Sequence, residues 1–195
     1  MLEKPDNFRT LWRGLATGFL ALAIYHLTQR LAELVTQATP WQAASLGSSF
    51  LLALFVGLVA ATWWRRDSSG GLFVELGLLA ALLMPVTWWI LSPLLPALVA
   101  KVAILDSWWR VMAYLFVVNL LLLAPTTFFL GAAVGATAIR PLERRYFFPG
   151  IVLGLATAWT LLGTLLLPLL GTLRSVSAAV AIAAFANLLE RRSYR

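Results

Sequence analysis

The sequence contains no cysteine, a single histidine and only 12% charged residues. Without cysteine the chain has no disulfide, no thiolate nucleophile and no cysteine-ligated metal or iron–sulfur site. His26 alone, with few carboxylates near it in the sequence, does not make a metal site. These absences exclude the chemistry that clusters of cysteine and histidine perform.

The motifs of familiar enzymes are missing as well. The sequence has no G-x-S-x-G elbow, no H-E-x-x-H, no P-loop and no G-x-G-x-x-G after a strand. The net charge is +7, but the 15 lysines and arginines are scattered in ones, twos and threes between apolar blocks. A nucleic-acid-binding face would need them clustered. We therefore expect no catalytic centre, no cofactor and no nucleic-acid partner.

Long apolar runs are what the sequence does have. Hydrophobic residues make up 61% of the chain, against roughly 45–50% in an average soluble domain. A helix needs about 20 apolar residues to cross a bilayer, and six segments qualify: 11–35, 42–63, 71–91, 108–139, 148–171 and 173–189. The sequence predicts an all-α, polytopic membrane bundle of about six transmembrane helices, one domain over 1–195, with bilayer lipids bound around it.

Two of these segments and one connection between them carry further signals. Basic residues before the first run imitate a secretory signal, but the run from Gly14 to Leu34 is too long for a signal core, so we expect an uncleaved helix. The fourth segment contains Pro125, which predicts a kink or tilt near 121–125. The connection 92–107 is apolar but broken by prolines, which favours a segment lying at the outer interface.

The distribution of basic residues predicts the orientation. Alternating the loops across six spans places eleven basic residues on one side: Lys4, Arg9, Arg13, Arg65, Arg66, Arg140, Arg144, Arg145, Arg191, Arg192 and Arg195. Four remain for the other side: Arg30, Lys101, Arg110 and Arg174. Cytoplasmic loops carry the excess of Lys and Arg. The bias predicts an inner-membrane protein with both termini cytoplasmic, anchored there by Arg65, Arg66, Arg140, Arg144 and Arg145.

Small residues at a spacing of four predict where helices pack closely, because helices in lipid associate through close contact rather than hydrophobicity. Three glycine pairs have this spacing: Gly14 with Gly18, Gly131 with Gly135, and Gly150 with Gly154. The spacing does not say whether these faces pack within the chain or against another protein.

Polar residues of the first segment form a stripe. His26, Gln29, Arg30 and Glu33 share one helical face near the predicted outer surface. Two interpretations remain open: a proton or cation site, since ionisable groups at membrane depth are costly and functional, or a self-satisfied stripe in which Arg30 pairs with Glu33. Glu75, near the cytoplasmic end of the third segment, either pairs with loop arginines or belongs to a transport path.

Several stretches together resemble the membrane domain of bacterial spermidine-synthase-like integral membrane proteins. They include "GFLALAIYHLTQRLAELV", "LFVELGLLAALL", "PTTFFLGA", which is similar to the family's P-T-x-x-M-G-A pattern, and "LLPLLGTLRS". In that family a soluble aminopropyltransferase-like domain usually follows. Residues 1–195 contain no such domain, so no catalytic residue carries over. His26 also stands where relatives often have an acidic residue.

These patterns lead to three functional hypotheses. The first is a non-catalytic accessory or scaffold subunit that docks on other membrane subunits or on copies of itself. The second is a small transporter or binding protein for polyamines or other organic cations, using His26, Glu33 and Glu75. The third is the membrane half of a split enzyme whose soluble half is a separate chain.

Overall fold

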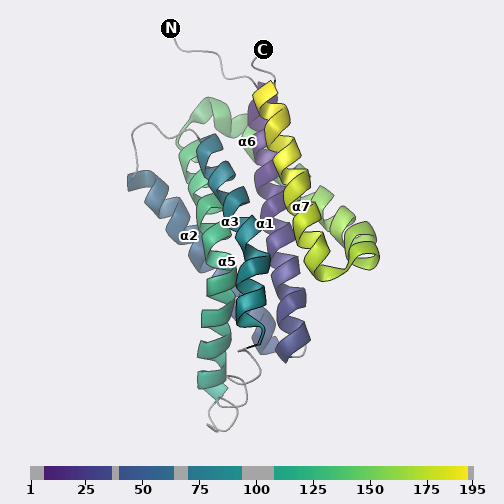
Figure 1. Ribbon diagram of the computed structural model, residues 1–195. Coiled ribbons are helices and arrows are strands. Elements are labelled where there is room, and N and C mark those ends of the chain that lie inside the picture. The colour runs from purple at the N-terminus through teal and green to yellow at the C-terminus, as the bar shows by residue number, and fades with distance from the viewer. Residues whose placement is uncertain (1–6, 37–39, 64–69, 94–107, 193–195) are drawn as a thin grey trace.

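Helices make up nearly all of the computed structural model, which describes residues 7–36, 40–63, 70–93 and 108–192. In chain order they are α1 (Asn7–Thr36), α2 (Pro40–Trp63), α3 (Gly70–Leu91), α5 (Trp108–Ala138), α6 (Pro141–Leu161), the π-helical turn η1 (Leu162–Leu166) and α7 (Leu167–Arg192). Figure 1 shows them as an up-and-down bundle. We call the end where α1 begins and α7 ends the proximal end, and the end where α3 stops and α5 starts the distal end.

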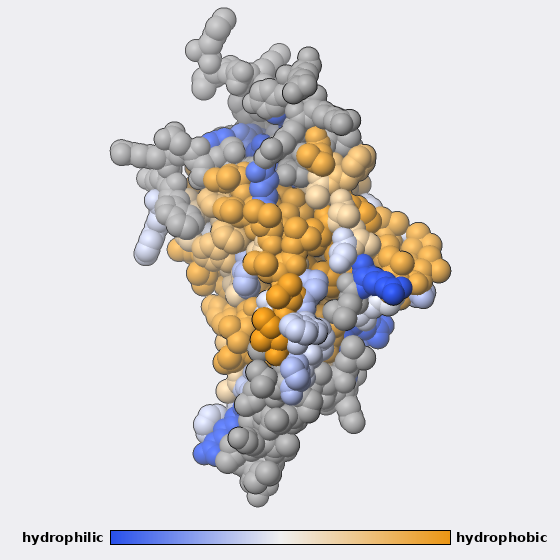
Figure 2. All heavy atoms as spheres, in the orientation of Figure 1, coloured by the Kyte–Doolittle hydropathy of each residue, from blue (hydrophilic) through white to orange (hydrophobic). Residues whose placement is uncertain are grey.

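Four segments are long and apolar enough to cross a membrane: Gln42–Trp63, Leu72–Ile90, Trp109–Ala138 and Glu143–Thr172. Large apolar side chains point outward from them, among them Leu51, Phe55, Leu83 and Val152. Figure 2 shows apolar residues covering most of the middle of the visible face. The prediction of an all-helical membrane protein is confirmed at this level. The predicted interfacial segment 92–107 lies almost wholly outside the described residues.

The first and last predicted segments, 11–35 and 173–189, are not among these four. In α7 the apolar stretch is short, Arg174–Phe185. The first segment lies in α1, which is the centre of the core: Phe19, Leu20 and Ile24 are fully buried. A helix surrounded by protein can carry polar side chains that find partners on its neighbours, so it need not be apolar all round.

Two groups of helices meet at this core. In one, α1 packs along α6 and α7; in the other, α5 packs along α2 and α3. The groups join where α1 contacts α5 and where α3 contacts α7. The helix α6 begins at Pro141, earlier than the predicted 148, because proline fits the first helical turn and Glu143 there favours the positive end of the helix dipole.

Glycines hold α1 against α6. A Cβ atom at Gly14 or Gly18 would overlap the carbonyl oxygen of Phe147 or Ile151, on α6. From the other side, Gly150 and Gly154 approach the α1 backbone equally closely, and a Cβ at Gly150 would lie 3.0 Å from the Gly14 Cα atom. The two glycine pairs therefore face each other within the chain.

The third pair holds α5 against α2. A Cβ at Gly131 would overlap the Leu54 carbonyl oxygen, and one at Gly135 would lie 2.8 Å from that of Leu58. Gly57 of α2, which the spacing did not single out, presses on the backbone of Phe128 in return. All six predicted glycines thus lie at interfaces between helices of this chain.

Polar side chains add to the α2–α5 contact in its distal half. Asn119, which is buried, donates from Nδ2 to Ser45 Oγ (3.2 Å) and accepts a hydrogen bond from Gln42 Nε2 (3.3 Å). Ser49 Oγ donates to the Phe116 carbonyl oxygen (3.1 Å). Hydrogen bonds between helices in a membrane are worth about 1 kcal/mol each, so this network fixes the register of the pair.

Candidate functional site

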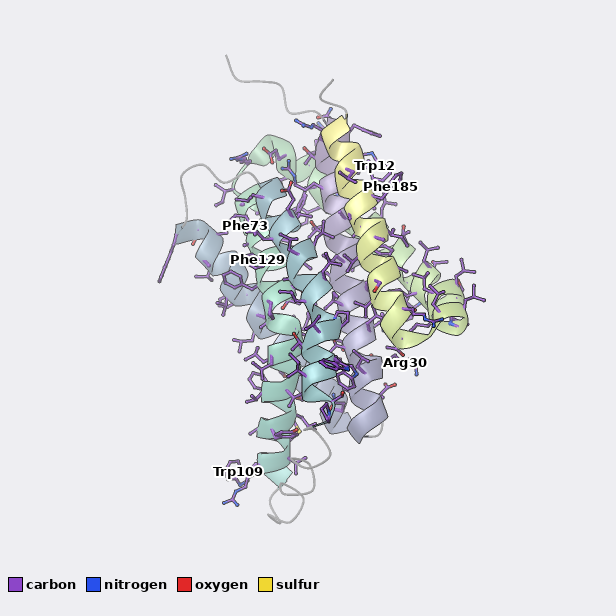
Figure 3. All side chains as sticks on the ribbon, viewed as in Figure 1. Trp12, Arg30, Phe73, Trp109, Phe129 and Phe185 are labelled. Atoms are coloured by element: carbon purple, nitrogen blue, oxygen red, sulfur yellow. The ribbon has the colours of Figure 1, made fainter. Side chains whose placement is uncertain are left out.

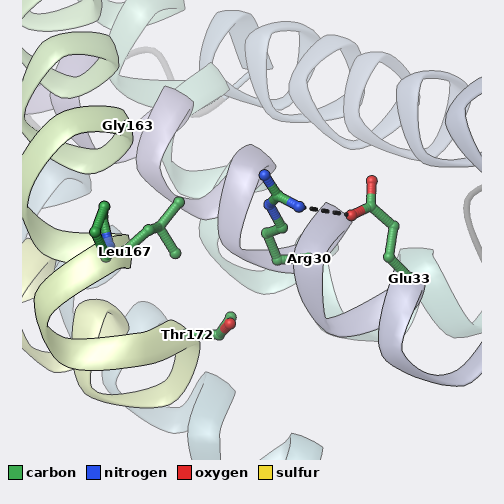
Figure 4. Close-up of a pocket in the computed structure, with 6 residues that line it drawn as sticks. Arg30, Glu33, Gly163, Leu167 and Thr172 are labelled. Atoms are coloured by element: carbon green, nitrogen blue, oxygen red, sulfur yellow. Dashed lines mark hydrogen bonds and ion pairs between the residues drawn. The ribbon is translucent and has the colours of Figure 1, made fainter.

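In the polar stripe of α1, Gln29 and Arg30 both form hydrogen bonds with Glu33. Glu33 accepts a hydrogen bond at each carboxylate oxygen, from Gln29 Nε2 to Oε1 (3.0 Å) and from Arg30 Nη1 to Oε2 (3.3 Å). The Arg30 side chain is 62% exposed and that of Glu33 22%. The carboxylate is thereby held in place, whereas much of the guanidinium faces outward with only Nη1 engaged by Glu33 (Figure 4). The stripe presents a fixed anion beside an accessible cation.

This part of α1 faces the bend between α6 and α7. A pocket of about 490 Å³ lies between them, lined by Arg30, Glu33, Gly163, Leu167, Pro168 and Thr172. Figure 4 shows Leu167 pointing toward α1. The volume is within the range of about 300–1,000 Å³ that is usual for ligand sites. One wall is ionic and the other mostly apolar, so the pocket suits an amphiphile.

His26 lies one turn before Arg30, and its ring also faces α6. Its ring centroid lies 4.8 Å from that of Trp159 on α6, edge to face, and 5.8 Å from that of Tyr25. The His26 Nε2 atom is buried and has no hydrogen-bond partner among the described residues. Trp159 remains 63% exposed. Trp159 therefore both packs against α1 and faces outward.

The bend itself, which we call the elbow (residues 162–175), has an unusual backbone. The helix loosens into the π-helical turn η1, and Gly171 then takes φ = 71° and ψ = 175°, a conformation that glycine adopts without strain and other residues almost never adopt. Ser175 Oγ closes the bend, since it lies 2.9 Å from the Leu166 and 2.6 Å from the Gly171 carbonyl oxygen and its one proton can be shared between them. The elbow thus brings Gly163 and Thr172 into one wall of the pocket.

Glu75 is not part of this site. It lies in the second turn of α3, half-buried, at the proximal end, whereas Glu33 lies near the last turn of α1 at the other end of the bundle (Figure 1). The structure therefore does not bring together the two carboxylates that a single cation site would use.

Basic residues gather at the proximal end instead. Glu143 accepts from Arg13 (3.3 Å) across the α1–α6 contact and from Arg140 (2.9 Å) within its own turn. The Arg13 and Glu143 side chains are only 12% and 17% exposed. Arg144 and Arg145 are exposed, and the Arg145 guanidinium lies 6.0 Å from the ring of Tyr146. Arg65 and Arg66 lie outside the described residues.

Sequence reasoning missed two features of these sites. The Arg13–Glu143 pair joins residues 130 positions apart, and no local pattern reveals such a contact. The elbow had a weak signal, since Pro168, Gly171 and Arg174 interrupt the apolar run, but this signal does not specify a π turn or a serine closure. Among the described residues, no three His, Asp or Glu side chains lie close enough together to hold a metal ion.

No protein-family model, curated protein or solved structure matches this chain. The resemblance to spermidine-synthase-like membrane domains therefore stays a prediction.

Proposed function

We propose that the chain is a six-pass inner-membrane protein with both termini in the cytoplasm, acting as a non-catalytic accessory or scaffold subunit of a larger membrane assembly. In this arrangement α1 and α7 also cross the membrane, which adds two crossings to the four apolar segments. The proximal end is cytoplasmic. Eleven of the fifteen basic residues then lie on the cytoplasmic side, as expected for inner-membrane proteins.

The observation that carries the docking role is the state of the proximal arginines. Glu143 already forms ion pairs with Arg13 and Arg140, so its charge is compensated. Arg144 and Arg145 remain exposed beside it. The glycine faces are used inside the bundle, which leaves these cations and the exposed apolar helix faces for a partner. We propose that the partner presents an acidic cytoplasmic surface, because rim charges set partner choice through complementary potentials.

The test is native mass spectrometry after extraction in mild detergent. We expect a complex of constant stoichiometry that the double variant Arg144→Gln/Arg145→Gln dissociates, with the loss enhanced by salt. Arg110→Gln is the matched control, since Arg110 is also an exposed arginine but lies in the first turn of α5 at the distal end. A monodisperse wild-type monomer without a partner would contradict the proposal.

The pocket beside the α1 stripe favours a second candidate, a binding or transport protein for organic cations such as polyamines. Glu33 would contact the cation in the pocket toward the distal end and Glu75 would contact it toward the proximal end, because the two carboxylates are far apart along the bundle. Uptake into proteoliposomes with Glu33→Gln and Glu75→Gln distinguishes this role. Unchanged uptake in both variants, or none in the wild type, removes it.

A further inference from the structure

The elbow pocket combines three features. It has an anion held rigidly by two donors, a cation beside it with free N–H groups, and an apolar wall. An exposed i, i+3 ion pair in water contributes little. Here, however, the pair faces a cavity whose opposite wall is formed by Gly163, Leu167, Pro168 and Thr172.

The elbow supplies a further polar group. In η1 the Leu167 N–H donates to the Leu162 carbonyl oxygen, five residues earlier. With the same spacing, the donor for the Gly163 carbonyl oxygen would be the N–H of residue 168. Pro168 has no N–H. The π-helical register therefore offers the Gly163 carbonyl no backbone donor, and Gly163 lines the pocket. π-helical turns in long helices occur often at functional sites.

The pocket lies toward the distal end of the bundle, where the proposed topology places the outer headgroups. Figure 3 shows Arg30 toward the distal end, opposite Trp12, with Trp109 lying farther out. Apolar side chains remain exposed on α6 and the elbow, among them Trp159, Leu165 and Leu169. A ligand in this pocket thus meets charged groups at its head and apolar surface beside its tail.

We propose that the elbow pocket binds a phospholipid with a zwitterionic headgroup that carries a primary ammonium, as in phosphatidylethanolamine. The phosphate binds the outward N–H groups of Arg30, because guanidinium and phosphate form strong charge-assisted hydrogen bonds. The ammonium donates to Glu33 and to the Gly163 carbonyl oxygen. The acyl chains lie along the apolar surface of α6 and the elbow.

The proposal is tested by native mass spectrometry of the purified, delipidated chain titrated with phosphatidylethanolamine, phosphatidylcholine and phosphatidylglycerol. We expect phosphatidylethanolamine to bind most tightly, since a quaternary ammonium cannot donate and a glycerol headgroup has no cation for Glu33. Arg30→Gln should weaken binding about tenfold, the loss of one charge-assisted hydrogen bond. Arg110→Gln, the distal control, should not change it.

Gly163→Leu gives a second variant that blocks the pocket without disturbing the fold. A Cβ at Gly163 meets nothing within 4 Å, and leucine favours helix more than glycine does. We expect an unchanged melting temperature and no retained lipid. Equal affinity for the three lipids, or wild-type binding in both Arg30→Gln and Gly163→Leu, would overturn the proposal.

Free phosphoethanolamine distinguishes a lipid site from a site for a soluble zwitterion. We expect it to displace the lipid only at far higher concentration, because it lacks the acyl chains that contact the apolar surface. Displacement at equal concentration would overturn the lipid assignment. The inference rests on the proposed membrane topology but not on the docking role, and neither lipid-site variant alters the proximal arginines.

Discussion

At the scale of single residues, stability depends on whether a helix surface has room for one methyl group. Gly18 and Gly57 have no such room, since a Cβ at either would overlap a carbonyl oxygen of the neighbouring helix. We expect Gly18→Ala and Gly57→Ala to push the helix pairs apart and to cost about 1–3 kcal/mol or more, as overpacking does. Thermal unfolding of the purified protein in detergent measures the loss.

Gly47 provides the matched control on the same helix as Gly57. A Cβ there meets nothing within 4 Å, so Gly47→Ala should leave stability unchanged or raise it by up to about 1 kcal/mol through helix propensity. If all three alanine variants melted together, close packing at these glycines would not be what holds the helices.

Glu143 is the residue where one side-chain change breaks two contacts. Its two carboxylate oxygens accept from Arg13 and Arg140 in a half-buried site. Glu143→Gln removes the carboxylate charge that both arginines bind and should cost about 1–3 kcal/mol, the range for hydrogen bonds to charged groups. Glu33→Gln, which breaks a more exposed pair, should cost under about 1 kcal/mol. Unfolding midpoints of the two variants test this order.

At the scale of elements, the elbow decides where α7 runs. Gly171 has φ = 71° and ψ = 175°, a region used almost only by glycine, and a side chain there costs roughly 1–3 kcal/mol. Ser175→Ala removes the hydroxyl that bonds the Leu166 and Gly171 carbonyl oxygens. We expect either Gly171→Ala or Ser175→Ala to let the α6–α7 hairpin splay.

Spin-label distances can measure this splaying, because the chain has no cysteine of its own. Labels at Val152→Cys and Phe185→Cys, both exposed and on the two arms, should show a broader distance distribution in Gly171→Ala and Ser175→Ala than in the parent. Gly163→Ala is the control, since it lies in the same elbow and a Cβ there meets nothing within 4 Å. Identical distributions in all variants would mean that packing on α1 alone positions α7.

The sequence predicted the helices but not their ends or bends. Apolar length located the ends of α2, α3 and α5 to within two residues, because a helix satisfies all its backbone groups within one segment of a bilayer. The start of α6 was placed too late, since its first turn is polar and was assigned to the loop before it. The π turn η1 carries no composition of its own, so its position depends on the packing of neighbouring helices.

At the scale of the whole molecule, the sequence predicted which faces pack but not what they pack against. Gly14, Gly18, Gly150 and Gly154 were recognised by spacing, yet nothing in the spacing pairs α1 with α6. Leucine faces are no guide either, because lipid tails are as apolar as leucine. The candidate site was likewise predicted only in part. The α1 stripe was predicted from its spacing, but the elbow that forms the other wall of its pocket is more than 120 residues away, and no local pattern shows that the two meet.

The proposed topology can be tested by cysteine labelling at both ends of the bundle. Under this proposal the proximal end lies in the cytoplasm, on the side with most basic residues, and six crossings would return the chain to that side. Single cysteines at Asp6→Cys, Ser68→Cys and Ser193→Cys should resist a membrane-impermeant maleimide in intact spheroplasts, whereas Trp109→Cys should react. All four should react once the membrane is permeabilised. Labelling of only one chain end would show an odd number of crossings, and the roles assigned to Arg144 and Arg145 would then fail with the topology.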